Sequence, residues 1–168
     1  DKTVVYKSSA FFLPKPEKGM GRRTYSSNNK RVAVVDSAGK VTPKECGTAI
    51  ITIKAEKTNI YQAAEKKIKI TVIPKSVNLK KVTPLGNGRL KAVWGKTSAV
   101  DGYHVYISLS KDFSHNTRQK YFKNKVNNAV WKDLTAKKNY YIKVRTYKTV
   151  NGKKMYSAWS RAKAVKVK

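Results

Sequence analysis

The stretch AVWKDLTAKKNYYIKVRTY, residues 129–147, decides the fold of this chain. It begins with a short apolar run, and after a mainly polar segment it continues with a second run in which apolar and polar residues alternate. Successive side chains of a β-strand point to opposite faces, so such alternation predicts strands with one buried face. We expect four residues of the second run to face a core: Tyr140, Ile142, Val144 and Thr146.

The same alternation extends along the whole chain, whereas helical periodicity is nearly absent. Runs rich in Val, Ile, Thr and Tyr are separated by Gly, Asn, Asp and Ser, which favour turns. In the first half, strands are expected at Thr3–Lys7, Ala10–Leu13, Arg23–Ser26, Val32–Asp36, Thr48–Ala55 and Lys66–Ile73. In the second half, they are expected at Leu79–Thr83, Arg89–Trp94, Tyr103–Ser108, Arg118–Phe122, Asn128–Trp131, Tyr140–Tyr147 and Ala162–Val167. This pattern predicts an all-β chain of two tandem immunoglobulin-like β-sandwiches.

The two sandwiches are expected to meet at VIPKSV, residues 72–77. Pro74 ends one strand because it has no N–H for the ladder, and strand character resumes directly after it. The sequence therefore predicts a first module over residues 1–75 and a second over residues 76–168.

The charge of the chain is strongly positive. Its 168 residues include 38 Lys and Arg but 9 Asp and Glu, which gives a formal net charge of +29. Such a charge attracts polyanions such as nucleic acid, anionic lipid headgroups or bacterial wall polymers. Most of the cations are lysines, which are hydrated point charges, so we interpret most of them as residues of solvated strand faces. No motif for specific nucleic-acid binding accompanies them.

The single cysteine and the lengths of the apolar runs limit which disulfides and membrane segments the chain can form. An intrachain disulfide is excluded, and Cys46, beside Gly47 and Thr48, is interpreted as a small packed side chain. No apolar run approaches the roughly 20 residues of a membrane-spanning helix, so we expect no membrane insertion. Because the chain begins at Asp1 rather than at an initiator methionine, we expect a monomeric fragment of a larger protein.

The second module resembles a fibronectin type III domain over essentially all of residues 76–168. Leu90, Ala92 and Trp94 alternate on one strand, and Trp94 falls where that family keeps its core tryptophan. VDGYHVYIS, residues 100–108, looks like the following strand. The resemblance implies that three of its residues point inward: Tyr103, Val105 and Ile107.

The crossover before the long strand carries the most specific part of this resemblance. Leu134 and Tyr140, six residues apart, match the family's tyrosine corner, which implies a hydrogen bond between the tyrosine hydroxyl and the backbone of the crossover. Ala129 and Trp131 then fall inward. Trp131 is bulkier than the aliphatic residue usual in the family, so we expect the core around it to repack.

The first module resembles a group 2 bacterial immunoglobulin-like domain. The resemblance rests on TYSSNNKRVAVVDSAGKVTPKECGTAIITIKA, residues 24–55, and on IYQAAEKKIKITVIP, residues 60–74. It includes a Ser-Ser-Asn turn, a turn at Gly39-Lys40-Val41, and a strand that begins with Gly-Thr-Ala. Domains of this kind are common in cell-surface and secreted proteins of Gram-positive bacteria, which implies an extracellular or cell-surface location.

The sequence offers no grouping of residues that would serve catalysis or bind a metal. The acids are Asp1, Glu17, Asp36, Glu45, Glu56, Glu65, Asp101, Asp112 and Asp133. None forms a pair that its spacing would bring together, and we interpret Asp36 and Asp101 as turn residues. His104 is interpreted as an exposed strand residue, and neither it nor His115 has a partner at a metal-ligand spacing. We therefore expect no enzyme activity and no cofactor.

One outward face of the second module combines aromatic and basic side chains. Its candidate binding residues are His104, Tyr106, Tyr141, Lys143, Arg145, Tyr147 and Trp159. YSAWS, residues 156–160, resembles the Trp-Ser-x-Trp-Ser signature of cytokine-receptor fibronectin modules, which implies that Arg145 stacks on Trp159. Such a face is either an internal ladder that stiffens the sheet or, given its composition, a binding surface for proteins or glycans.

These features lead to two main functional hypotheses. The first is a non-catalytic pair of extracellular modules from a larger bacterial surface protein, which contributes to adhesion by recognising a host protein (an immunoglobulin or a matrix glycoprotein, for example) or a glycan. The second is a passive spacer that presents another domain from the cell wall, with its lysines near an anionic wall polymer. Binding of nucleic acid is a third hypothesis, which only the net charge favours.

Overall fold

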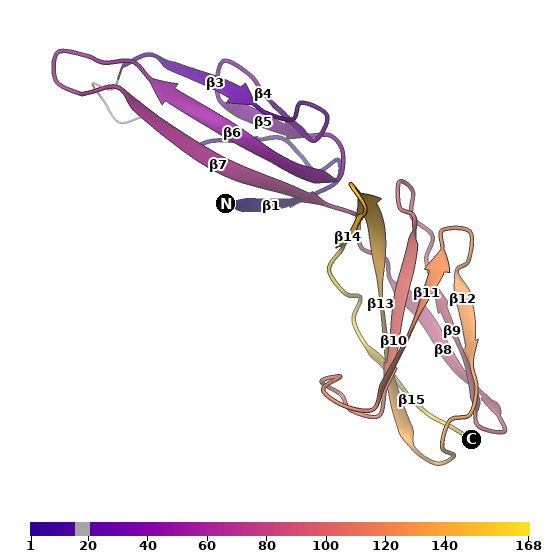
Figure 1. The fold of residues 1–168 in the computed structure, drawn as a ribbon. Coiled ribbons are helices and arrows are strands. Elements are labelled where there is room, and N and C mark those ends of the chain that lie inside the picture. Colours follow the sequence, from indigo (N-terminus) through magenta and orange to yellow (C-terminus); the bar gives the residue numbers. More distant parts are fainter. Residues whose placement is uncertain (16–20) are drawn as a thin grey trace. The chain divides into compact units, whose positions relative to one another are not determined.

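The computed structural model describes residues 1–15 and 21–168, so Glu17 lies outside the described residues. The chain divides into two compact units, Asp1–Ile73 (unit 1) and Pro74–Lys168 (unit 2) (Figure 1). In each unit, strands form two sheets. The predicted fold, two tandem immunoglobulin-like β-sandwiches, is confirmed. Across the described ranges, no helix is long and apolar enough to cross a membrane.

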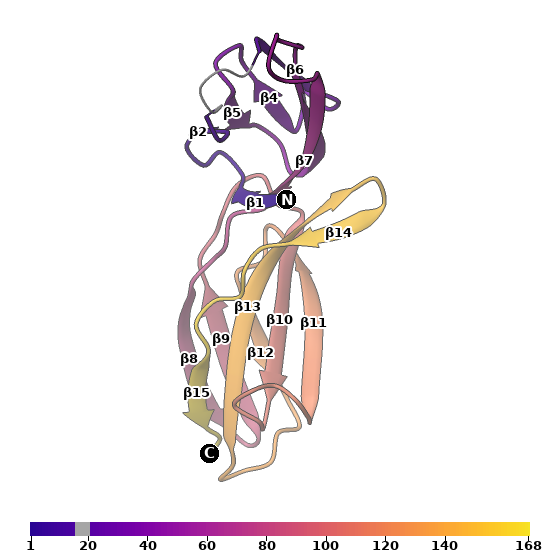
Figure 2. The ribbon, with the colours of Figure 1, turned by 90° about the vertical axis from the view of Figure 1, so that its left-hand side faces the viewer.

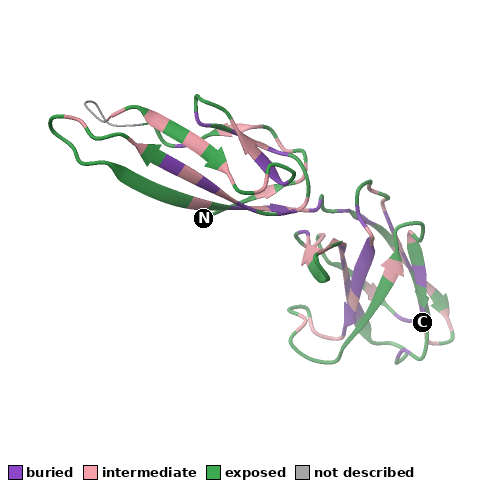
Figure 3. Ribbon diagram, turned by 45° about the horizontal axis from the view of Figure 1, so that its top comes forward, coloured by how far each residue is buried: buried purple, intermediate pink, exposed green. Residues whose placement is uncertain are grey.

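Unit 1 combines a larger and a smaller sheet. The larger sheet has the order β1-β7-β6-β3, with strands β1 (Lys2–Val5), β7 (Ala64–Ile73), β6 (Gly47–Ala55) and β3 (Arg23–Ser27). The smaller sheet has the order β2-β5-β4, with strands β2 (Phe11–Phe12), β5 (Lys40–Pro43) and β4 (Ala33–Val35). Half-buried and exposed residues alternate along β3, pink and green in Figure 3, because only one face of its sheet meets the core.

Unit 2 also contains two sheets. One has the order β12-β9-β8, with strands β12 (Asn128–Trp131), β9 (Arg89–Trp94) and β8 (Leu79–Gly86). The other has the order β11-β10-β13-β14, with strands β11 (Thr117–Lys123), β10 (Gly102–Ser108), β13 (Asn139–Val150) and β14 (Lys153–Tyr156). A last strand, β15 (Lys163–Lys166), pairs with the first residues of β13, whereas β14 pairs with its last residues.

The core of unit 2 lies between these two sheets. Every residue expected to face inward there is buried: Leu90, Ala92, Trp94, Tyr103, Val105, Ile107, Ala129, Trp131, Tyr140, Ile142, Val144 and Thr146. The bulky Trp131 is fully buried, and Arg118 and Lys120 of β11 lie over its ring, 5.7 and 5.0 Å from the ring centre. Two long side chains thus cover the indole ring.

The tyrosine corner is present as expected. The hydroxyl of Tyr140 accepts a hydrogen bond from the amide of Thr135, at 3.0 Å. Leu134 is buried beside it in the same cluster. This contact fixes the crossover that leads from β12 into β13.

We predict that Tyr140→Phe lowers the free energy of unfolding of unit 2 by about 1–2 kcal/mol, because the amide of Thr135 loses its acceptor while the ring keeps its place. Denaturant unfolding of the full chain, followed by tryptophan fluorescence, measures this change. Tyr141→Phe is the matched control, since Tyr141 is half-buried on the opposite face of the same strand. Equal effects of the two substitutions would contradict the assigned role of the Tyr140 hydroxyl.

The sequence-based assignment missed two strands. Lys40 and Val41, expected in a turn, begin β5. The turn ends at Gly39, whose φ is +75°, and the carboxylate of Asp36 closes it by accepting hydrogen bonds from the amides of Ala38 and Lys40, both at 2.9 Å. The role expected for Asp36 in a turn is confirmed.

The second missed strand is β14. Asn151 and Gly152, with φ of 49° and 75°, form a tight turn that joins β13 to β14. Positive φ at both positions is typical of the hairpin turns that Asn-Gly favours. The chain after β13 therefore forms two short strands. Figure 2 shows β14 paired with one end of β13 and β15 paired with the other end.

Candidate functional site

The candidate face lies on the outer side of the sheet β11-β10-β13-β14. In the antiparallel pair of β10 and β13, His104 lies opposite Arg145 and Tyr106 lies opposite Lys143. The residues between them, such as Val105 and Val144, are buried in the core. Because side chains alternate along a strand, these four point to the outer side of the sheet.

Two serines attach the segment that carries Trp159 to β13. The amide of Ser157 donates to the carbonyl of Thr146 at 3.1 Å, and the hydroxyl of Ser157 accepts from the amide of Thr146 at 3.0 Å. Ser160 makes the same two contacts with Val144, at 2.8 and 3.1 Å. Because serine hydroxyls take the place of backbone carbonyls, the segment runs beside β13 without being a regular strand, and Trp159 is held over the sheet.

Cations and aromatic rings alternate across this face. The ammonium nitrogen of Lys143 lies 3.9 Å from the ring centre of Phe113 and 4.7 Å from that of Trp159. The guanidinium carbon of Arg145 lies 4.2 Å from the ring centre of Trp159 and 3.7 Å from that of Tyr156. The expected stacking of Arg145 on Trp159 is confirmed. We call Phe113, Lys143, Trp159, Arg145 and Tyr156 the ladder.

His104 is buried, and the expectation that it is an exposed strand residue was wrong. Only 1% of it is exposed. Tyr121 stacks on its ring with centres 4.0 Å apart, and the rings of Trp159 and Tyr156 lie at 5.4 and 5.6 Å. Alternation along β10 assigns His104 to the outer side of the sheet, but aromatic side chains from other segments cover that side. Ser108, which alternation along β10 assigns to the same side, is buried as well.

The hydrogen bonds of His104 define its protonation. The Nε of Arg145 donates to Nδ1 of His104 at 3.2 Å, so Nδ1 carries no proton. The proton is therefore on Nε2, which donates to Oε1 of Gln119 at 2.6 Å. Burial lowers the pKa of His104 to about 4; the bond to Gln119 opposes this shift, whereas the charges of Arg145 and Lys154 add to it. His104 is neutral at physiological pH.

The other expected residues differ in how far they join the ladder. Tyr106 packs against Trp159 with ring centres 4.8 Å apart, and Tyr147 contacts Tyr121 at 5.6 Å. Tyr141 is half-buried on β13 opposite Ser108, and none of the ring contacts described for the ladder reaches it. Ring, cation–π or hydrogen-bond contacts thus connect all the candidate binding residues except Tyr141.

Several residues of the face were missed from sequence. Tyr121 of β11 is 45% exposed; its hydroxyl lies 2.9 Å from that of Tyr156, and the ammonium nitrogen of Lys154 lies 5.3 Å from its ring centre. Burial and the hydrogen bond with Tyr156 raise the pKa of Tyr121 to about 12. Alternation along β11, where Phe122 packs against the core, could have placed Gln119 and Tyr121 on this face.

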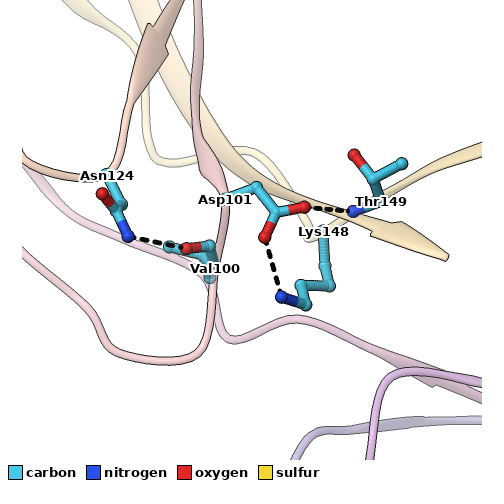
Figure 4. A network of polar contacts seen from close by, with 5 residues as sticks. All are labelled: Val100, Asp101, Asn124, Lys148 and Thr149. Atoms are coloured by element: carbon cyan, nitrogen blue, oxygen red, sulfur yellow. Dashed lines mark hydrogen bonds and ion pairs between the residues drawn. The ribbon is translucent and has the colours of Figure 1, made fainter.

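A polar network fixes the turn before β10 (Figure 4). Asp101 accepts hydrogen bonds from the ammonium of Lys148 and the amide of Thr149, both at 2.7 Å, and the side chain of Asn124 donates to the carbonyl of Val100 at 3.3 Å. Burial alone would raise the pKa of Asp101, but the contacts with Lys148 and Thr149 together hold it below its ordinary value. Asp101 is a turn residue, as expected.

We predict that Asp101→Ala lowers the free energy of unfolding of unit 2 by about 1 kcal/mol at pH 7, because the contacts of its carboxylate are lost. The loss is no larger because the side chains of Asp101 and Lys148 are both more than a third exposed to solvent. A carboxyl whose pKa is lower in the folded state stabilises the fold above its unfolded pKa of about 3.9 and loses that contribution as the pH falls further. Urea unfolding at pH 7 and at pH 3 measures both effects. A difference between wild type and variant that persists undiminished at pH 3 would contradict the role of the charge.

The acids and histidines of the described chain form no group of three or more that could hold a metal ion. Asp112 instead closes its own loop by accepting hydrogen bonds from the hydroxyls of Ser110 and Ser114 and from the amide of Ser114. These contacts hold the pKa of Asp112 far below its ordinary value. The polar residues described so far therefore stabilise turns rather than converge on a reacting atom.

Comparisons with known proteins agree with this architecture. The model of the intimin immunoglobulin-like domain family matches residues 14–56. A search among curated proteins found no match to the sequence. A segment of two fibronectin type III domains from chicken tenascin has a TM-score of 0.50 and 14% identity, and the match covers 92% of this chain and 87% of that one. This likeness supports the tandem sandwich fold.

Two further solved structures are similar at lower scores. The FN1–FN3 domains of chicken CNTN1 have a TM-score of 0.48 and 16% identity. The match covers 88% of this chain and 54% of that one, so this chain spans about half the length of that fragment. A fibronectin type III domain from human KIAA0970 has a TM-score of 0.42 and 17% identity, with 54% of this chain and 72% of that one covered.

Proposed function

We propose that this chain is a non-catalytic pair of extracellular modules from a larger bacterial surface protein, and that it contributes to adhesion by recognising a host protein or a glycan. The observation that carries this proposal is the match of residues 14–56 to the intimin immunoglobulin-like family, in a chain with a tandem sandwich fold. Sandwich domains of this architecture are widespread at cell surfaces. The assignment of the first module to group 2 and to a Gram-positive bacterium stays a prediction.

The exposed part of the candidate face is where we expect the partner to bind. Tyr121 and Lys154 are exposed there, above the half-buried rings of Tyr147 and Tyr156. Tyrosine and a nearby cation on a rigid surface have the composition of interface hot spots. Since Arg145 and Lys143 already stack on rings of unit 2, the residues free to meet a partner are those at the rim of the ladder.

An array of host proteins and glycans at physiological salt tests this proposal. The full chain is expected to bind one of them, and Tyr121→Ser with Lys154→Ser is expected to weaken that binding at least about tenfold, the loss of one hot spot. Lys153→Ser is the matched control, because Lys153 is exposed on the same strand but alternates to the other side. If binding survives the double substitution, this face is architecture only.

The ladder itself favours a second function, that of a stiff spacer. Its cations are stacked on rings of their own unit, and a serine-bound segment closes it, which is what a sheet reinforced against bending requires. In this case the full chain binds nothing on the array, and loss of the ladder lowers stability alone. Repeats of similar modules in the parent protein would favour the same role.

A further inference from the structure

A group of unpaired cations lies on the sheet of unit 2 that does not carry the ladder. On β9, Leu90, Ala92 and Trp94 are buried, so Arg89 and Lys91 point to the outer side of the sheet β12-β9-β8. Lys81 of β8 lies opposite Val93 on this side, and Lys132 directly follows β12. All four side chains belong to exposed residues. We call Lys81, Arg89, Lys91 and Lys132 the cationic face.

In the part of the chain that the structure describes, no ion pair neutralises these charges. Strands β8, β9 and β12 contain no Asp or Glu, and the ion pairs found among the described residues join Lys54 and Lys67 to Glu65 and Lys148 to Asp101. Like charges on adjacent strands repel each other. On the ladder face, by contrast, Lys143 and Arg145 stack on aromatic rings. The four charges of the cationic face thus have neither an ion-pair partner nor a ring partner among the described residues.

The residues between the cations narrow the chemistry of the ligand. The centre of the face is Lys91, whose cross-strand neighbours are Thr83 and Val130. The aromatic residues of these three strands, Trp94 and Trp131, both point into the core. The face therefore offers no ring on which a base or a sugar could stack, and it contacts a ligand through charge alone.

The spacing of the cations fits a repeating anion. Residues two apart on a strand are separated by about 7 Å, and neighbouring strands by about 5 Å, so the four charges form a flat grid. Lysine acts as a point charge that does not require the planar geometry of a carboxylate. A flexible linear polymer with a phosphate at each repeat can place successive charges over such a grid, whereas rigid duplex DNA follows its own helical path.

We propose that the cationic face binds a linear polymer with repeating phosphate groups, of the phosphodiester-linked polyol kind. The inference goes beyond the proposed adhesive function, and it would hold if no host partner existed. It assigns to unit 2 a second surface, with charge as its only means of recognition. Affinity for such a polymer is expected to fall steeply with salt, because binding releases counterions.

Binding of the full chain to poly(glycerol phosphate) and to inorganic polyphosphate, measured across a salt series, tests the proposal. Four substitutions on the cationic face, Lys81→Thr, Arg89→Thr, Lys91→Thr and Lys132→Thr, are expected to reduce affinity at least about tenfold and to reduce the steepness of the logarithmic salt dependence by about 3. Threonine suits a strand, so the fold is kept. Circular dichroism and the unfolding midpoint verify this.

The matched control removes four exposed lysines elsewhere in unit 2: Lys111→Thr, Lys123→Thr, Lys125→Thr and Lys153→Thr. It changes the net charge by the same amount, and affinity is expected to stay within about threefold. Equal losses in both variants would overturn the proposal, since net charge alone would then explain binding. Tighter binding of polygalacturonate or of duplex DNA than of the two phosphate polymers would overturn it as well.

Discussion

Arg145→Ala is expected to lower the free energy of unfolding of unit 2 by about 3 kcal/mol. The guanidinium lies between the rings of Trp159 and Tyr156, and each such contact contributes about 0.5–1 kcal/mol. Its Nε also donates to the buried Nδ1 of His104, and an unsatisfied buried acceptor costs about 1–3 kcal/mol. The effect exceeds that of an ordinary surface arginine because one side chain joins three segments of the unit.

Tryptophan fluorescence is a selective probe for this measurement, since all three tryptophans, Trp94, Trp131 and Trp159, belong to unit 2. Arg145→Lys keeps the charge but loses the planar fork, so an intermediate loss is expected. Arg89→Ala, at an exposed position outside the ladder, should stay within about 0.5 kcal/mol of wild type. If Arg145→Ala does the same, the ladder does not stabilise the fold.

The second large effect is a pH dependence that originates at His104. Its pKa is about 4 in the folded state, against an ordinary value near 6.5. Between these two values the unfolded chain binds a proton at this site and the folded chain does not, so stability falls as the pH falls from about 6.5 to about 4. A shift of this size corresponds to at most about 3 kcal/mol, and below about pH 4 this contribution no longer changes.

Burial is the largest cause of this low pKa, and polar groups from three strands modify it. Arg145 of β13 and Lys154 of β14 both disfavour a second proton, whereas Gln119 of β11, which accepts a hydrogen bond from Nε2 of the ring, opposes the shift. Protonation would also place a donor on Nδ1, against the N–H of Arg145, so the hydrogen bond between them would be lost. The pKa values of Asp101 and Asp112 lie below their ordinary values, so the stability that these two carboxylates contribute is lost only under about pH 4.

Unfolding of the full chain in urea at a series of pH values between 4 and 7 measures this slope. His104→Gln is the informative variant, because its amide oxygen can accept from Arg145 and its N–H can donate to Gln119 while it carries no titratable group. Its stability should be nearly flat over this range. His115→Gln, at an exposed position in the loop before β11, is the control and should retain the slope. A wild-type chain without the slope would contradict the buried, neutral state of His104.

The strands and the inward residues could be predicted from sequence because they depend on local patterning. Alternation around Trp94, Val105 and Ile142 indicates which side of each strand is apolar, and burying that side is what forms the sandwich. The tyrosine corner was recognisable for a similar reason, since Leu134 and Tyr140 are close in sequence. The hairpin turn at Asn151-Gly152, which leads into the unpredicted strand β14, is equally local, because Asn-Gly is itself a turn signal.

The candidate face was only partly readable. Alternation correctly assigns Arg145 and Lys143 to the outer side, and the resemblance of residues 156–160 placed Trp159 beside them. Neither alternation nor the resemblance could show that Tyr121 stacks on His104. That contact depends on the register between β10 and β11, which neighbouring residues do not encode. For the same reason, sequence alone treated His104 as exposed.

The sequence by itself determined the all-β architecture, the apolar side of each strand and the excess of positive charge, because each depends on residue type and local spacing. Only the tertiary structure decided what those charges meet. It stacks Arg145 and Lys143 between rings from three separate segments, and it leaves Lys81, Arg89, Lys91 and Lys132 on a sheet face without a carboxylate. A charge is neutralised by what lies within a few ångströms in space, and in a sandwich those neighbours come from strands far apart in the chain.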